Sequence, residues 1–190
     1  MDLHLWNRAQ ARLTDGWGVA FGGLASPERF VMKPQAKIAS PSGDAEEHLK
    51  SFIDKFTPEH QRLIREVRKA LRRRLPTAYE LAYDNYNFFV IGYGPTERPS
   101  DCILSMAAGA NGIGLCFIRG ASLPDPKRVL LGSGKQTRFL RVPSHDVLGR
   151  PEVEALISAA VAQSKAPMPA GGRGGLIIRS VSAKQRPRRK

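Results

Sequence analysis

Two segments near the middle of the chain repeat apolar residues at intervals of three and four. In the first segment, Asp44 and Glu47 resemble a capping box, and the pattern after Asp44 predicts a helix over residues 45–56. In the second, Thr57 and Pro58 form a start signal, and the pattern predicts a helix over residues 58–75 that Pro76 ends. Each predicted helix has one apolar face, which marks the side that packs on the core.

After these helices the apolar pattern changes from helical spacing to alternation. The alternation predicts five strands, over residues 79–83, 85–93, 101–107, 114–119 and 136–142. Residues 109–112 are predicted to form a hairpin turn between the third and fourth strands. A helical turn is predicted over residues 125–131 and a last amphipathic helix over residues 151–163. This order predicts an α+β domain with two N-terminal helices, an antiparallel sheet of about five strands and a C-terminal helix.

The two ends of the chain differ from the predicted domain, which covers residues 44–163. We expect residues 1–43 to be a poorly ordered N-terminal extension, with Met32 as an alternative start of translation. Residues 164–190 are predicted to be a Pro/Gly linker followed by a basic tail, although residues 176–181 are β-prone.

Positive charge is concentrated in two places. The 190 residues carry a net charge of +13, and residues 164–190 hold eight basic and no acidic side chains. The second predicted helix carries seven more basic residues. Because such excess favours anionic partners, nucleic acid is a candidate partner, and the alternative is a solvated helix face. The predicted contacts are Arg62, Arg65, Lys69, Arg72 and Arg73 on the helix, and Lys184, Arg186, Arg188, Arg189 and Lys190 in the tail.

Polar and aromatic residues cluster in the first predicted strand. There Glu80 shares a face with Asp84, opposite Tyr79 and Tyr83. The cluster indicates either the wall of a small-molecule pocket or a hydrogen-bonded corner between helix and sheet. The candidate ligand-binding residues are Tyr79, Glu80, Tyr83, Asp84, Asn85, Lys135 and Arg138.

Motifs for catalysis or cofactor binding are weak. Residues 132–135 read Gly-Ser-Gly-Lys, but Gln136 follows and a strand is predicted next, so a glycine turn is favoured over a phosphate loop. Cys102 and Cys116 are too few for a disulfide scaffold or a four-ligand zinc site. No residue is assigned a catalytic or metal-ligating role, and no cofactor is expected. An enzyme that uses Glu80 and a lysine as an acid–base pair is the least favoured alternative.

Several short motifs, in this order, resemble those of a known family. They are Glu-Glu-His-Leu at 46–49, Arg-Leu-Pro at 74–76, Tyr-Glu-Leu-Ala-Tyr-Asp-Asn-Tyr at 79–86, Leu-Pro-Asp-Pro-Lys at 123–127 and Leu-Leu-Gly-Ser-Gly-Lys at 130–135. Over residues 44–163 the chain resembles the YdhG-like family of small bacterial domains, whose function is largely unassigned. The resemblance implies a compact α+β domain in the cytoplasm and, from one branch, frataxin-like handling of iron. Iron delivery relies on clustered carboxylates, and the basic residues of the second helix argue against it here.

Two hypotheses follow from the sequence. The first is a non-catalytic cytoplasmic module that binds a small ligand or a metal near residues 79–86. The second is an accessory nucleic-acid-binding protein that uses the basic helix and the basic tail. The chain has no apolar run long enough to span a membrane, so no membrane association is expected, and the sequence leaves the oligomeric state open.

Overall fold

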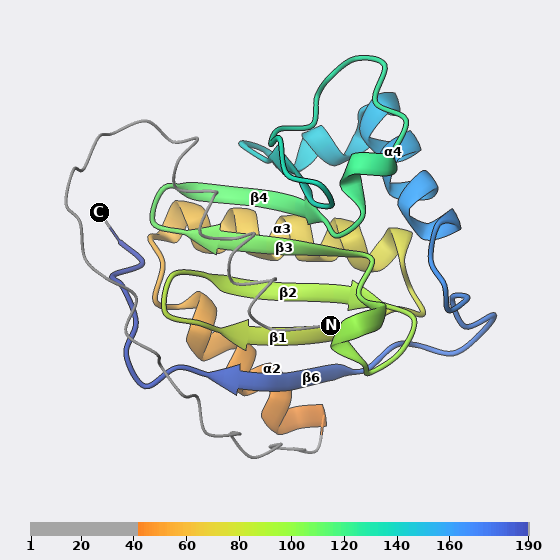
Figure 1. The fold of residues 1–190 in the computed structure, drawn as a ribbon. Coiled ribbons are helices and arrows are strands. Elements are labelled where there is room, and N and C mark those ends of the chain that lie inside the picture. The colour runs from red at the N-terminus through yellow and green to blue at the C-terminus, as the bar shows by residue number, and fades with distance from the viewer. Residues whose placement is uncertain (1–41, 190) are drawn as a thin grey trace, which may run out of the picture. The chain divides into compact units, whose positions relative to one another are not determined.

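Six strands form one mixed sheet in the computed structural model, which describes residues 42–189. The strands are β1 (Tyr79–Asp84), β2 (Phe89–Gly94), β3 (Leu104–Gly109), β4 (Gly112–Phe117), β5 (Arg138–Arg141) and β6 (Leu176–Val181). Their spatial order is β5-β4-β3-β2-β1-β6 (Figure 1). The expected N-terminal extension covers residues 1–43. Residues 1–41, which include the alternative start at Met32, lie outside the described residues, whereas residues 42 and 43 begin the first described helix.

The last strand, β6, is the main departure from the predicted fold. Strands β1 to β5 pair antiparallel in chain order, as predicted, but β6 pairs parallel with β1, from Leu176 opposite Glu80 to Val181 opposite Asp84. The sheet therefore has six strands and is mixed, which corrects the prediction of about five antiparallel strands. Residues 176–181 also belong to the sheet, so a domain that ends at residue 163 leaves out one of its strands.

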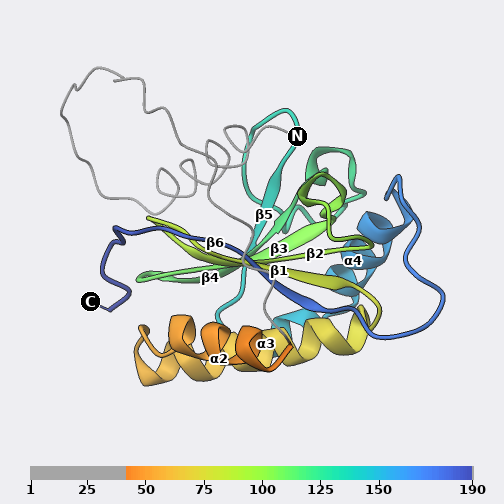
Figure 2. The same ribbon diagram turned by 90° about the horizontal axis from the view of Figure 1, so that it is seen from below.

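Two long helices cover one face of the sheet, side by side in a single layer (Figure 2). They are α2 (Ser42–Ile53) and α3 (Pro58–Arg74). The Thr57 hydroxyl accepts a hydrogen bond from the N–H of His60, which caps α3 as the sequence indicates. The third helix, α4 (Pro151–Ala162), lies on the β4 side of the sheet, away from β6 (Figure 1).

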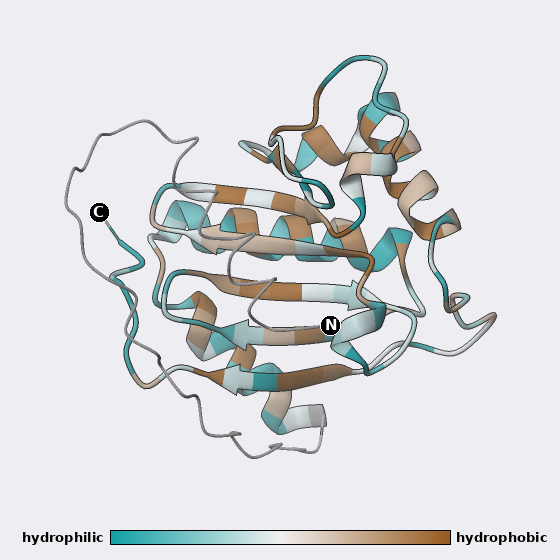
Figure 3. Ribbon diagram, in the orientation of Figure 1, coloured by the Kyte–Doolittle hydropathy of each residue, from teal (hydrophilic) through white to brown (hydrophobic). Residues whose placement is uncertain are grey.

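The core lies between the helix layer and the sheet. Helix α3 buries its apolar stripe there, and hydrophilic and hydrophobic bands alternate along it (Figure 3). The stripe consists of Ile64, Val67, Ala70 and Leu71. Facing strand residues such as Phe89 and Leu115 are fully buried against the same cluster. The amphipathic spacing of the sequence therefore identifies the buried face of α3 correctly.

Short 3-10 helices occupy three connections, at Pro99–Asp101, Gly120–Ser122 and His145–Gly149. Over residues 125–131 no helix forms, and the predicted helical turn is reduced to one hydrogen-bonded turn, in which the N–H of Arg128 donates to the carbonyl of Asp125 at 3.1 Å. Instead, the Asp125 carboxylate accepts the backbone N–H groups of Val129 at 3.0 Å and Leu130 at 2.8 Å. A side chain that satisfies these donors competes with the helical hydrogen bonds, which explains the error.

Candidate functional site

Strand β1 directs its two acidic residues at the helix layer. Glu80 and Asp84 share the face of β1 that packs against α2 and α3, opposite Tyr79 and Tyr83, as the alternation predicts. The exposed fraction is 2% for Glu80 and 0% for Asp84. Because an unpaired buried carboxylate costs several kcal/mol, the partners of these two residues determine what each end of β1 can do.

At the start of β1, Glu80 is held by two arginines of α3. Its carboxylate accepts hydrogen bonds from Arg68, at 2.6 Å from Nη2, and from Arg72, at 2.9 Å from Nη1. Arg68 also bonds Glu46 of α2, at 2.7 Å between Nη2 and Oε1. The hydrogen bond from Arg68 lowers the pKa of Glu46. Burial disfavours the charge on Arg68, but hydrogen bonds to Glu46 and Glu80 outweigh that effect and raise its pKa.

The same arginines line a groove of about 430 Å³ between α2 and α3, here called the basic groove. Its lining holds seven basic residues and one acidic residue, and none is aromatic. The lining residues are Glu46, Leu49, Lys50, Ile53, Arg65, Arg68, Lys69, Arg72, Arg73 and Arg173. A concave surface with this balance of charge favours an anionic ligand.

Three of the seven basic residues in the groove are paired with carboxylates. Arg68 and Arg72 bind Glu80 and Glu46, and Arg65 binds Asp54 at 2.8 Å. Within residues 42–189, no carboxylate pairs with the other four, which are Lys50, Lys69, Arg73 and Arg173. All four are exposed, so their charges are available to a partner.

At the other end of β1, Asp84 is held by residues from both ends of the described chain. Its Oδ2 lies 2.5 Å from Nζ of Lys55, and its Oδ1 lies 3.1 Å from Nη2 of Arg188. The side chain of Arg188 is 2% exposed, and its guanidinium lies 5.9 Å from the ring centre of Phe56. Asp84 and Arg188 therefore form a buried ion pair between β1 and the chain's last residues.

Residues 182–189, here called the C-terminal segment, dock along this end of β1. The N–H of Ser182 donates to Asp84, and the N–H of Arg186 donates to Tyr86, each at 2.9 Å. Carbonyl groups at the end of a helix have no hydrogen-bond partner within the helix. Arg189 donates to backbone carbonyls just after α2, and one of them is the carbonyl of Asp54, at 2.8 Å. For Arg188 and Arg189 these contacts correct the prediction of phosphate binding, since both side chains bind the protein itself. Lys184 and Arg186 are exposed, and Lys190 lies outside the described residues.

The structure does not bring the seven predicted ligand-binding residues together. Glu80 and Asp84 are occupied by their cationic partners, and Lys135 and Arg138 lie at the opposite side of the sheet, with three strands between β5 and β1. Arg138 donates to the backbone carbonyls of Gly134 and Thr137 in its own loop. Of the two readings of the cluster, the hydrogen-bonded corner is the one that these contacts match.

The remaining members of that predicted set also fill structural positions. Tyr83 is buried, and burial raises its pKa to about 12. Asn85 gives its backbone carbonyl to Arg188, at 2.5 Å from Nη2. Tyr79 lies on the opposite face of β1 from Glu80. The seven residues are therefore divided between two sheet faces and two distant strands.

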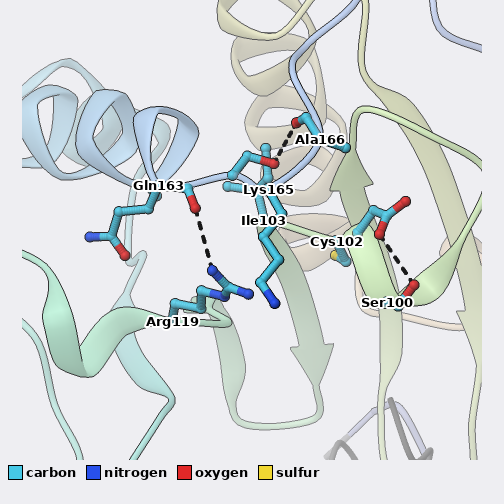
Figure 4. A pocket seen from close by; sticks show the side chains of 10 residues that line it. Ser100, Cys102, Ile103, Arg119, Gln163, Lys165 and Ala166 are labelled. Carbon is cyan, nitrogen blue, oxygen red and sulfur yellow. Dashed lines mark hydrogen bonds between the residues drawn. The ribbon is translucent and has the colours of Figure 1, made fainter.

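A second hollow, near the end of β2, is too small for a ligand (Figure 4). Its volume is about 50 Å³, enough for a water molecule or two, and Arg119 donates to the carbonyl of Gln163 beside it. Cys102 lines this hollow, and burial raises its pKa to about 12. Burial raises the pKa of Cys116 as well, so both thiols are poor nucleophiles at neutral pH.

Sequence reasoning identifies part of the basic groove. Arg65, Lys69, Arg72 and Arg73 appear in both the predicted set and the observed lining. It misses Lys50, although the i, i+4 spacing of Glu46 and Lys50 on an amphipathic helix is a usable signal. It also misses Arg173, whose position beside the groove depends on the long-range pairing of β6.

Comparison with protein-family models, with curated proteins and with solved structures finds no match to this chain. The resemblance to YdhG-like domains therefore stays a prediction. Within residues 42–189, no helix has the length and apolar character needed to cross a membrane, and no group of three or more His, Cys, Asp or Glu residues is arranged to hold a metal ion. The charge and shape of the basic groove are the features that bear on function.

Proposed function

We propose that the protein binds the phosphate backbone of nucleic acid through the basic groove. The observation that carries this proposal is the set of four exposed cations in one groove without a carboxylate partner among residues 42–189: Lys50, Lys69, Arg73 and Arg173. Neutralising phosphates with such side chains releases condensed counterions, which supplies most of the free energy of non-specific binding.

The buried carboxylate beneath the groove supports this function by fixing two of the arginines. Glu80 holds Arg68 and Arg72 from the sheet side, at 2.6 and 2.9 Å. Arginine side chains lose rotamer entropy when they bind a phosphate, and this loss is smaller when the side chain is already held in place. Arg72 is therefore pre-oriented toward the groove.

The competing interpretation is that the cations form an ordinary solvated helix face. Cations at the C-terminal end of a helix stabilise its dipole, and Arg72, Arg73 and Arg74 occupy that position in α3. This effect does not account for Lys50 of α2 or Arg173, which lie on other elements and line the same groove. Convergence of cations from three parts of the chain favours a shared anionic partner.

The proposal is tested by neutralising cations in two matched sets. The groove variant carries Lys50→Gln, Lys69→Gln and Arg73→Gln, and the control variant carries Lys135→Gln, Lys165→Gln and Lys184→Gln, which are exposed lysines outside the groove. Both sets lower the net charge equally. Binding of a labelled duplex DNA is followed by fluorescence anisotropy at about 50 mM salt, where phosphate contacts are strong.

We expect the groove variant to bind at least about tenfold more weakly than the unaltered chain, and the control variant to bind within about twofold. Equal losses in the two variants would mean that net charge alone drives binding. Equal losses, or an absence of binding by the unaltered chain, would contradict the proposed function.

A further inference from the structure

We infer that the nucleic acid bound in the basic groove is double-stranded and is bound without regard to sequence. This inference rests on the proposed function and adds to it whether the bound nucleic acid is single-stranded or double-stranded. Two features of the described residues carry it: the absence of aromatic side chains in the groove, and the position of α3 within the helix layer.

The groove lacks the side chains that usually bind single strands. Proteins that bind single-stranded nucleic acid stack bases on exposed aromatic rings, each worth about 1–3 kcal/mol. None of the ten lining residues is aromatic. Within residues 42–189, Tyr86 is the large aromatic residue with an exposed ring, and Arg186 lies over that ring at 5.6 Å, at the other end of β1. A flexible strand therefore finds cations in the groove but no stacking surface.

The groove cations extend over a length that corresponds to several phosphates of a duplex. From Arg65 to Arg73 the helix rises about 12 Å, at about 1.5 Å per residue. Over about 12 Å a duplex carries about seven phosphates, since it has one charge per about 1.7 Å of axis. Of the five cations of α3 in this stretch, Lys69 and Arg73 have no carboxylate partner within residues 42–189, and the unpaired Lys50 and Arg173 lie beside them. The groove can therefore neutralise part of the phosphate charge of a duplex.

The position of α3 argues against base recognition. Helices that read bases protrude from the protein and enter the major groove. Here α3 lies flat on the sheet with α2 alongside it (Figure 2). The cations of α3 line the groove between the two helices, where they can contact phosphates at the surface of a duplex. Contacts limited to phosphates position a protein without reading sequence.

The test compares three labelled probes with the full chain at about 50 mM salt: a duplex of about 20 base pairs, a second duplex of scrambled sequence, and a single strand chosen to lack self-pairing. Affinities are measured by fluorescence anisotropy, and the groove and control variants are titrated in parallel. We expect both duplexes to bind at least about fivefold more tightly than the strand, and to agree with each other within about fivefold.

Two different failures are distinguishable in this experiment. A strand that binds within about fivefold of the duplexes, and loses affinity in the groove variant, overturns the inference while the proposed function stands. The same holds for duplexes that differ by more than about fivefold. Equal affinity of the groove and control variants for every probe, or an absence of binding, overturns the proposed function itself.

Discussion

The basic face of α3 and the C-terminal segment are both rich in basic residues, but these residues have different roles in the structure. Both are rich in arginine and lysine, and both are predicted from charge to contact phosphates. In α3, Lys69 and Arg73 are exposed and have no carboxylate partner within residues 42–189. In the C-terminal segment, Arg188 is buried on Asp84 and Arg189 binds backbone carbonyls. A cation's availability therefore depends on whether the fold supplies an internal acceptor for it.

The position of each carboxylate explains the difference. Asp84 is 0% exposed and holds both Lys55 and Arg188. Glu80 is nearly as buried, but its two arginines come from the helix that forms the groove, and Lys69 and Arg73 of that helix have no carboxylate partner within residues 42–189. One buried carboxylate thus anchors the C-terminal segment, whereas the other holds two arginines of the basic groove.

The largest expected effect in this comparison is on stability, through the buried ion pair. Replacing Arg188 by methionine leaves Asp84 buried with Lys55 as its remaining partner, and we expect a loss of about 3 kcal/mol in the free energy of unfolding. Urea denaturation followed by circular dichroism measures this change. The affinity of the folded variant for duplex DNA should stay within about twofold of the unaltered chain.

The control for that prediction is Arg186→Met, in the same segment. Arg186 is exposed and lies over the ring of Tyr86, so its replacement should cost less than about 1 kcal/mol. If the two variants were equally stable, Arg188 would not anchor the segment.

A smaller effect is expected for Glu46, the one acidic residue of the groove lining. Its pKa is lowered by Arg68, so it stabilises the fold above its ordinary pKa near 4.5, and this stabilisation is lost as the pH falls through its lowered pKa in the folded state. Its side chain is 48% exposed, so solvent screens the pair, and Glu46→Gln should cost less than about 1 kcal/mol at neutral pH. Urea denaturation between about pH 7 and 3 should show the difference from the unaltered chain shrinking on the acid side.

The same Glu46→Gln replacement is expected to tighten binding of duplex DNA, because it removes a negative charge that competes with phosphate for Arg68 and Arg72. The gain should be about twofold to fivefold in affinity at about 50 mM salt and should shrink as salt is added. Weaker binding by this variant would mean that Glu46 orients the arginines rather than competing for them.

The smallest effect is expected for the exposed cations of the C-terminal segment. Lys184→Gln with Arg186→Gln removes two positive charges outside the groove, and duplex affinity should change by no more than about twofold. Anisotropy titration measures this directly. A loss of duplex affinity as large as that of the groove variant would mean that the C-terminal segment contacts phosphates, as the charge pattern predicts.

Local patterns in the sequence account for much of the fold. Thr57 and Pro58 start α3 as predicted, and the hairpin turn between β3 and β4 lies where Gly109 and Gly112 indicate. The pairing of β6 with β1 could not be read in this way, since the Pro/Gly-rich stretch before Leu176 is typical of a linker and the partner strand is about one hundred residues away.

In the candidate site, too, local contacts can be predicted from the sequence and long-range contacts cannot. Helical spacing predicts that Arg65, Lys69 and Arg72 share a face. Spacing contains no information on the pairing of Arg188 with Asp84, since the two residues are brought together by β6. Charge composition alone therefore overestimates the number of cations available to a partner.

The salt dependence of duplex binding tests the central claim most directly, because its slope counts the cations that contact phosphates. Affinities of the unaltered chain, the groove variant and the control variant are measured from about 25 to 200 mM salt. The slope of log affinity against log salt should be shallower by about two to three in the groove variant, at about 0.9 per lost contact, and unchanged in the control variant. Equal slopes in the groove and control variants would contradict the claim that the cations of the basic groove are the ones that contact phosphate.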